Sequence, residues 1–272
     1  MKKSLCVSWK SWVLCAVLCG VACKKGEKLP SVPSTNEVFQ KMSAREKALS
    51  AFSIQVRTEE AGLTVEHSLA FRTPDFMRAD VTQPQKLALS FDGQNYYRLE
   101  EEAKKLNILS LQLPTVERKM ALSLLMSAFV PEGFQLPRLV LRDSKQSWVE
   151  PGQLLRMENH VSEDGESATL VYVVRWPSLD FLKKEVFVDG QQQMELVMQE
   201  EQCMPENHLC FPTKIVAKQH GEVLASKTIQ LLSFQEAASN EHFVLQAPEG
   251  FAVERHTLSS LQELAPFLQG EN

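Results

Sequence analysis

Two hydrophobic periodicities alternate along the chain after residue 34. Apolar residues first recur at steps of three, four and seven, which predicts an amphipathic helix over residues 35–50 whose apolar face carries Val38, Phe39, Met42, Leu49 and Phe52. Ser34 and Glu37 form a capping-box pattern at its start. From Leu63 onward the period becomes two, which is typical of strands with one buried and one solvated face.

This alternation predicts several antiparallel strands in the first half of the chain. Asp92-Gly93 predicts a type I′ hairpin turn that leads into a strand over residues 95–99. The inward positions before that turn are Leu63, Val65, His67, Leu69 and Phe71, then Met77, Ala79 and Val81, then Leu87, Leu89 and Phe91.

A second helix is predicted over residues 115–130, where Thr115 caps the start and Pro131 follows the end. From Met120 onward this helix is apolar nearly all round, with Leu124, Leu125 and Phe129 among its residues. Such a helix must be covered on most sides or act as a lid over an apolar interior. The pattern alone cannot separate an ordinary core from the wall of a cavity.

The second half returns to strands, which we expect over residues 170–176, 184–188, 194–200, 211–219, 222–234 and 242–246. Turn pairs separate several of them, at Asp164-Gly165, Asp189-Gly190 and His220-Gly221. The residues from 257 to 272 read as a short helix and a tail. No alternation of strand and helix is present, which excludes a doubly wound parallel sheet.

The expected fold is therefore α+β and mainly β, with about ten or eleven antiparallel strands and two helices. A sheet of that size curls into an unclosed barrel, and its inward face needs a cover that the helices can supply. Of the 272 residues 44% are apolar, which excludes a disordered polyelectrolyte. The formal net charge of −5 gives no basic footprint, so we expect no nucleic-acid partner.

The first 34 residues are predicted to be a targeting segment and a tether rather than part of the folded domain. Lys2 and Lys3 precede an apolar stretch that is too short to span a bilayer, as in a signal peptide over residues 1–22. The small residues before Cys23 resemble the lipobox of bacterial lipoproteins, in which that cysteine is acylated and becomes the N-terminus. Cleavage without a lipid is the alternative. Residues 23–34 would then be the acylated cysteine and a polar tether.

Cys203 and Cys210 are the cysteines that remain after Cys23, and strand-like segments lie on both sides of them. This spacing favours a disulfide that closes a hairpin in an oxidising compartment. His208 lies between them, so a metal clip is the alternative. No second cluster supplies ligands at metal spacing, and we expect neither a metal nor a cofactor.

Residues 69–99 resemble the corresponding segment of the LolA family of periplasmic lipoprotein carriers, which also includes LolB-like and RseB-like relatives. Pro74, the Thr-Gln-Pro at residues 82–84 and the Asp92-Gly93 turn carry the resemblance. A segment ending in Pro248-Glu-Gly250 resembles the closing strand of that family. The resemblance covers residues 35–99 and 211–256, and implies one half-barrel domain over residues 35–256 with helices that cap an apolar cavity.

The resemblance implies that the inward residues bind lipid. The expected cavity and lid residues are Leu63, Val65, Leu69, Phe71, Met77, Val81, Leu87, Leu89, Phe91, Met120, Leu124, Leu125 and Phe129. Carriers of this family have an arginine directly before the first proline that hydrogen-bonds the lid, but Thr73 occupies that position here. Arg72 falls on the polar face of its strand, so we do not assign the lid contact to it.

The functional expectation is a monomeric, membrane-anchored protein that faces the periplasm, most simply at the outer membrane, and binds lipid or lipoprotein acyl chains. An RseB-like sensor with a protein partner in the envelope, or a structural lipoprotein with a filled core, is the alternative. We expect no enzyme, because no nucleophile-elbow, zinc-protease, dinucleotide or P-loop motif occurs in the chain. His67, on an apolar face, reads as a core or cavity residue.

Overall fold

The computed structural model describes residues 29–264, apart from residues 74, 127, 135–143, 164–165, 205–207, 235 and 237. The chain divides into the units Met1–Ser31 and Val32–Asn272, and the second of these carries the fold. The predicted signal peptide, Cys23, the Asp164-Gly165 turn and the end of the predicted tail lie outside the described residues. Within the described part, no helix combines the length and the apolar character needed to cross a membrane.

Both predicted helices are present. The helix α2 (Thr35–Ala48) has the predicted capping box, in which the Ser34 side chain accepts from the backbone N–H of Glu37 and the Glu37 carboxylate accepts from the backbone N–H of Ser34. Helix α3 spans Thr115–Met126, four residues shorter than predicted. Phe52 was assigned to the face of α2, but it lies in the first strand, whose inward positions continue the apolar pattern of the helix.

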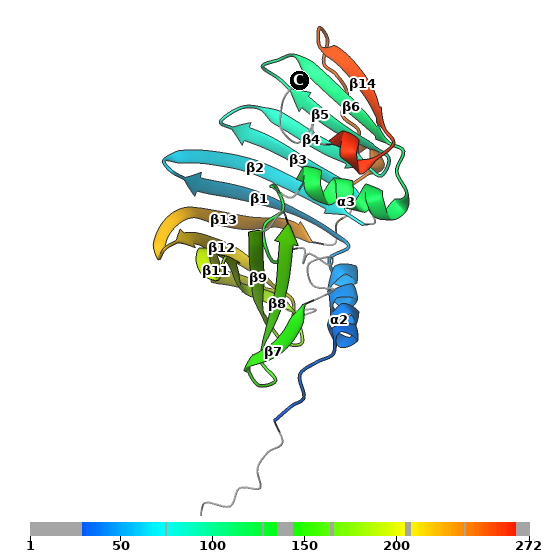
Figure 1. Cartoon of the computed structure of the whole chain (residues 1–272). Helices are drawn as coiled ribbons and strands as arrows, with labels where there is room; N and C mark the ends of the chain where they lie inside the picture. Colours follow the sequence, from blue (N-terminus) through cyan, green and yellow to red (C-terminus); the bar gives the residue numbers. More distant parts are fainter. Residues whose placement is uncertain are drawn as a thin grey trace, which may run out of the picture. The chain divides into compact units, whose positions relative to one another are not determined.

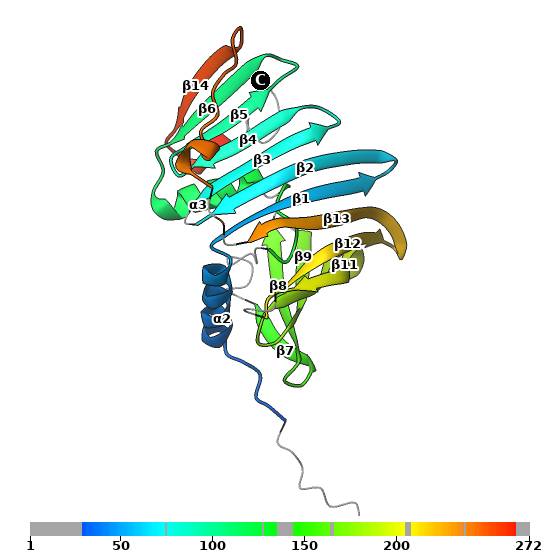
Figure 2. The ribbon, with the colours of Figure 1, turned by 180° about the vertical axis from the view of Figure 1, so that it is seen from behind.

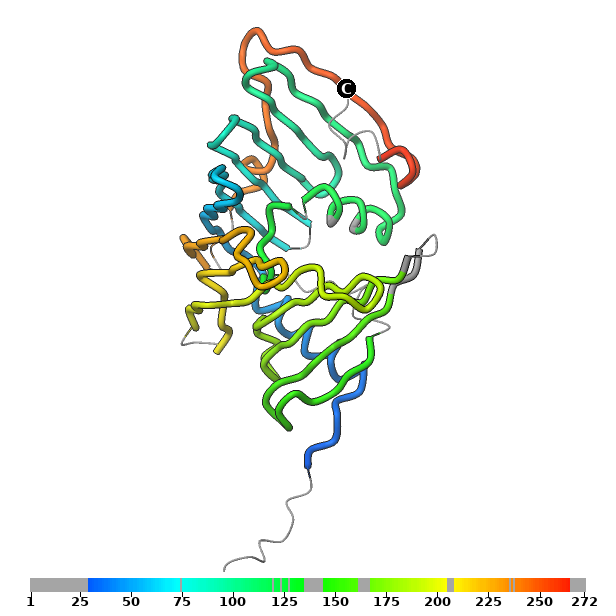
Figure 3. Tube along the Cα trace, turned by 60° about the vertical axis from the view of Figure 1, so that its left-hand side comes forward, coloured from blue at the N-terminus to red at the C-terminus, as the bar shows by residue number. Residues whose placement is uncertain are grey.

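The described residues form one sheet of fourteen strands, not ten or eleven as predicted. Its order is β14-β6-β5-β4-β3-β2-β1-β13-β12-β11-β10-β9-β8-β7, antiparallel throughout except for β14 beside β6. The strands are β1 (Ala51–Glu60), β2 (Leu63–Arg72), β3 (Phe76–Gln83), β4 (Leu87–Asp92), β5 (Asn95–Glu100), β6 (Lys105–Leu111), β7 (Lys145–Glu150), β8 (Leu154–Glu163), β9 (Glu166–Arg175), β10 (Asp180–Val188), β11 (Gln191–Cys203), β12 (Cys210–Gln219), β13 (Glu222–Phe234) and β14 (Ala252–Leu258). Figure 3 follows the chain through this sheet.

Five strands were not predicted, namely β1, β6, β7, β8 and β14, and two of them lack alternation for physical reasons. Strand β6 is buried on both faces, and β14 is exposed along nearly its whole length, so neither alternates between apolar and polar. The predicted strand over residues 242–246 is wrong: the short 3₁₀ helix η2 (Asn240–Phe243) begins before it. The tail contains a second 3₁₀ helix, η3 (Leu261–Leu264).

The sheet has two differently covered faces. Helices α2 and α3 lie on one side, which we call the inner face, and η2 lies on the other side, the outer face (Figures 1 and 2). The main core joins the inner positions of the strands to α2 and α3. On the outer face, residues 238–251, the outer segment, place Leu245 in a second cluster with Tyr97, Leu106 and Ile108.

A buried ion pair connects α2 to the second half of the sheet. The Arg45 Nη1 atom lies 2.6 Å from Oδ1 of Asp180, and the two side chains are 4% and 2% exposed. Arg45 also donates to the carbonyl oxygens of Gly133 at 2.9 Å and Cys210 at 3.2 Å. The backbone N–H of Cys210 donates to Asp180 at 3.1 Å. One guanidinium therefore holds α2, β10, β12 and the segment after α3 together.

The Gly133 segment fits this site closely. Gly133 has φ of +90°, and a Cβ atom there would lie 2.9 Å from Cβ of Phe181. Both the left-handed backbone and the close contact require glycine. The carbonyl of Gly133 can therefore reach Arg45 without displacing the core around Phe181.

The disulfide between Cys203 and Cys210 is confirmed, and it joins the end of β11 to the start of β12 as predicted.

The turn pairs Asp189-Gly190 and His220-Gly221 both adopt positive φ, as a type I′ turn requires. The type I′ prediction at Asp92-Gly93 is wrong. Gly93 alone of these two has positive φ, and the Asp92 carboxylate instead accepts hydrogen bonds from the backbone N–H groups of Gln94 and Asn95.

We expect Arg45→Ala to lower the free energy of unfolding by about 3–5 kcal/mol, because it leaves the Asp180 carboxylate buried without its counter-ion. The measurement is urea unfolding followed by circular dichroism. Arg57→Ala is the control, because Arg57 pairs with Glu59 on the surface and its side chain is 54% exposed. That variant should lose at most about 1 kcal/mol. Equal losses in the two variants would contradict the role given to Arg45.

Candidate functional site

The predicted lipid-binding strand residues all occupy the inner face in register. Phe71, Met77 and Phe91 form one row across β2, β3 and β4, and Leu69, Ala79 and Leu89 form the next. Their exposure rises toward the hairpin tips. Leu69, Met77, Val81, Leu89 and Phe91 are buried, Val65, Phe71 and Leu87 are half-buried, and Leu63 is 68% exposed.

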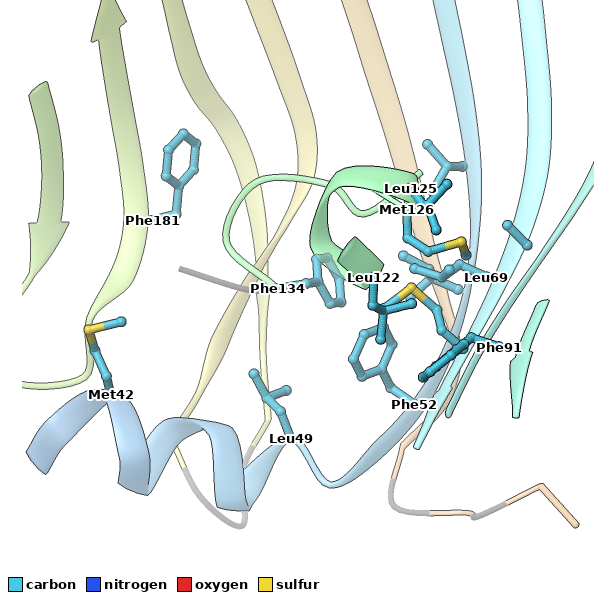
Figure 4. Close-up of a cluster of buried hydrophobic side chains, with 14 of the residues drawn as sticks. Met42, Leu49, Phe52, Leu69, Phe91, Leu122, Leu125, Met126, Phe134 and Phe181 are labelled. Atoms are coloured by element: carbon cyan, nitrogen blue, oxygen red, sulfur yellow. The ribbon is translucent and has the colours of Figure 1, made fainter. Parts of the chain in front are cut away.

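Helix α3 presents one side to this face and the other to solvent. Leu122, Leu125 and Met126 are buried and gather with Leu69 and Phe91 (Figure 4). On the opposite side, Leu124 is 52% exposed and Val116 is 69% exposed. Of the two alternatives that its composition left open, cover on most sides or a lid, the first is therefore wrong for the described side chains. Met120 and Phe129 are half-buried.

The described side chains beneath α3 are packed together. Leu69 and Phe91 are 0% exposed and Met126 is 1% exposed. An open depression of about 410 Å³ lies elsewhere, between the β1–β2 and β12–β13 hairpin tips, where Leu63 and Val223 line it. The predicted cavity under α3 is thus not seen in the part of the chain that the structure describes, and it stays a prediction.

His67 contacts the segment that leaves α3. It is 5% exposed on the inner face of β2, and its Nε2 lies 2.9 Å from the carbonyl oxygen of Phe129. Because a carbonyl only accepts, Nε2 carries the proton. Burial lowers the pKa of His67, and the positive charge of Lys227 lowers it further against the effect of the Phe129 hydrogen bond.

A second polar contact, between Lys227 and Glu132, lies close to the contact between His67 and Phe129. Nζ of Lys227, on β13, is 3.4 Å from Oε2 of Glu132, which follows α3 by six residues. Their side chains are 27% and 22% exposed. Burial raises the pKa of Tyr172 to about 12, with a further contribution from the charge of Glu132. His67 and Lys227 thus both hold the segment that connects α3 to the rest of the chain, which we call the lid exit (residues 128–134).

Arg72 has a structural role on the outer face, consistent with its place on the polar side of β2. It donates to the carbonyl oxygen of Ala238 at 2.7 Å and to the Asn240 side chain. Its guanidinium also lies 4.0 Å from the ring centre of Phe76 and 5.2 Å from that of Phe243. Arg72 therefore fixes the outer segment and has no contact with α3 among its described partners. Thr73 is exposed.

The sequence analysis missed the charged residues of the inner side, although a signal for them exists. Arg45 falls three residues after Met42, on the apolar face of a predicted helix. Lys227 falls two residues before Ile229, at an inward position of a predicted strand. A charge at an apolar position predicts a buried partner, but the sequence does not reveal that the partners are Asp180 and Glu132.

No protein-family model matches the chain, and no curated protein matches it in sequence. Solved structures are similar in fold. A LolA superfamily protein from Nitrosomonas europaea is 11% identical, with 78% of this chain and 98% of that chain covered and a TM-score of 0.45. An outer membrane lipoprotein-sorting protein domain from Vibrio parahaemolyticus is 11% identical, with 77% and 97% covered and a TM-score of 0.48.

The lipoprotein LppX from Mycobacterium tuberculosis is 12% identical, with 77% of this chain and 99% of that chain covered and a TM-score of 0.31.

The lowered pKa of His67 makes stability depend on pH. Above its ordinary value of 6.5, the imidazole is neutral in both the folded and the unfolded chain. As the pH falls below that value, the unfolded chain binds the proton first, so stability is lost until the pH passes the folded pKa. His67→Gln keeps an N–H donor for Phe129 but does not titrate. We expect wild type to lose more stability than this variant between pH 7 and pH 5, as measured by urea unfolding. Equal losses of stability in wild type and in His67→Gln would contradict the lowered pKa assigned to His67.

Proposed function

We propose that this chain is a lipid-binding protein of the cell envelope that takes up acyl chains between the inner face of its sheet and α3. The observation that carries the proposal is the way α3 is held. Its apolar side covers the inner face through side-chain packing, whereas polar contacts from His67 and Lys227 hold the lid exit. Contacts of this kind can be broken and remade without unfolding the sheet.

The magnitudes favour such an exchange. Opening α3 would expose Leu122, Leu125 and Met126, at about 1.5–3 kcal/mol for each side chain. An acyl chain of about sixteen carbons gains about 0.8 kcal/mol for each methylene removed from water, or roughly 12 kcal/mol in all. The bound chain can therefore offset the opened helix. The packed arrangement described here would be the closed, unloaded state.

The location follows from the N-terminal sequence. Acylation of Cys23 and the tether to residue 34 would anchor the unit to a membrane, most simply the outer membrane, as a monomer that faces the periplasm. Cargo could be a lipoprotein or a free lipid, and the role would be binding or hand-over rather than catalysis. The resemblance of residues 69–99 to lipoprotein carriers and the disulfide support this assignment.

The direct test is native mass spectrometry of residues 24–272, which contain the whole compact unit. We expect mass additions that correspond to lipid after purification without detergent, or after incubation with palmitate. A chain that takes up no lipid under either condition would leave the packed interior as a core, and the proposal would be wrong.

A matched pair of variants tests the binding face. Val65 and Thr64 are consecutive half-buried residues on β2, so their side chains point to opposite faces. We expect Val65→Asp to weaken palmitate binding about tenfold, because a charge then lies where the acyl chain should pass. Thr64→Asp should bind like wild type. Circular dichroism checks that both variants fold, and equal binding by the two would argue against the inner face.

A further inference from the structure

Two lysines interrupt the apolar inner face. Lys227 on β13 pairs across the sheet with Thr58 on one side and Ile215 on the other. One row further toward the hairpin tips, Lys184 on β10 lies between Leu196 and Tyr172. Both lysines therefore occupy inward positions of a face that is otherwise largely apolar.

The apolar surroundings of Lys227 disfavour its positive charge. The neighbouring inner side chains Ile215 and Ile229 are 1% and 3% exposed. Its counter-ion, Glu132, is 3.4 Å away and belongs to the lid exit rather than to the sheet. A charge on an apolar face requires a partner, and here that partner is on the segment that must move when α3 opens.

Lys184 and His67 lie on either side of this pair. The Lys184 Nζ lies 5.7 Å from the ring centre of Tyr172, and Glu132 is close enough to act on the titration of that tyrosine. On the other side, His67 uses Nε2 for Phe129, while its buried Nδ1 has no hydrogen-bond partner among the described atoms. Lys184 and Glu132 thus both lie near Tyr172, whereas Nδ1 of His67 carries no proton and can only accept a hydrogen bond.

We propose that Lys227, with Lys184 on the same face, binds the anionic head group of an amphiphile whose acyl chain lies on the inner face. This inference rests on the proposed function and names the ligand class. The ligand is an acyl chain with either a carboxylate head group, which carries one negative charge, or a phosphate head group, which carries one or two. Glu132 holds the site of the head group in the unloaded state. When an anion replaces Glu132 at Lys227, the lid exit loses one of its contacts with the sheet, so head-group binding favours the opening of α3.

The experiment measures binding of decanoate, decyl phosphate and decanol to residues 24–272 by titration calorimetry at pH 7. The three probes share one chain length, and decanol is neutral. We expect wild type to bind at least one of the two anions about tenfold more tightly than decanol, as a charge-assisted hydrogen bond allows. A preference for decanoate would indicate a fatty-acid head group, and a preference for decyl phosphate a phospholipid-like one.

Variants separate the head-group site from the acyl site. Lys227→Gln should bring the anions to the affinity of decanol and leave decanol unchanged. Glu132→Gln should strengthen anion binding severalfold, because the competing carboxylate is gone. The controls are Lys214→Gln and Lys183→Gln, because both lysines lie on the outer face. Lys214 is opposite Thr228 in the strand register. Lys183 forms ion pairs with Glu185 and Glu195. Both controls should bind all three probes like wild type.

The outcomes that overturn this inference differ from those that overturn the proposed function. Equal binding of anions and decanol by wild type, or a parallel loss of all three probes in Lys227→Gln, would remove the anion site but keep the acyl site. Failure of wild type to bind any of the three probes would remove the proposed function itself.

Discussion

The arrangement depends on one buried charge pair, Arg45 with Asp180. The guanidinium lies where α2, β10, the disulfide hairpin and the segment after α3 meet, and carbonyl oxygens and a carboxylate accept from its terminal nitrogens Nη1 and Nη2. A buried pair of this kind adds little net stability over an apolar replacement, but the loss of one member leaves a charge without compensation. Its contribution is therefore one of position. It determines which backbone segments meet, and so it determines the position of Gly133, seven residues after α3.

That position matters because α3 itself has no strand-like hydrogen bonding to the sheet. On one side of the lid exit, Gly133 accepts a hydrogen bond from Arg45, whereas on the other side Phe129 accepts one from His67 and Glu132 pairs with Lys227. The lid exit is thus attached to the buried ion pair at Gly133, and to the sheet by separate polar contacts at Phe129 and Glu132. In the proposed function, α3 moves about this fixed point while the sheet remains intact.

The sequence could predict the parts of the fold in which the hydrophobic period is undisturbed. Local patterns predicted the capping box at Ser34 and Glu37, the inner positions of the strands between Leu69 and Phe91, and the disulfide at Cys203. Strand β6 was not, because Ile108 and Leu109 are both buried on opposite faces and no alternation results. The polar residues around the lid exit could not be paired either, since Lys227 and Glu132 are 95 residues apart and meet through the tertiary fold alone.

The pairing of β1 with β13 has a consequence for how the chain reaches its native state. Ser53 and Ser233, on these two strands, lie 2.8 Å apart through their hydroxyl groups although 180 residues separate them. The N-terminal strands leave the ribosome, and in an exported chain the translocation channel, long before β13 does. The edge of β1 that β13 covers therefore stays unpaired until most of the chain has emerged. An open strand edge attracts other strands. Binding by a chaperone along β1 during that interval would prevent aggregation without any change to the finished molecule.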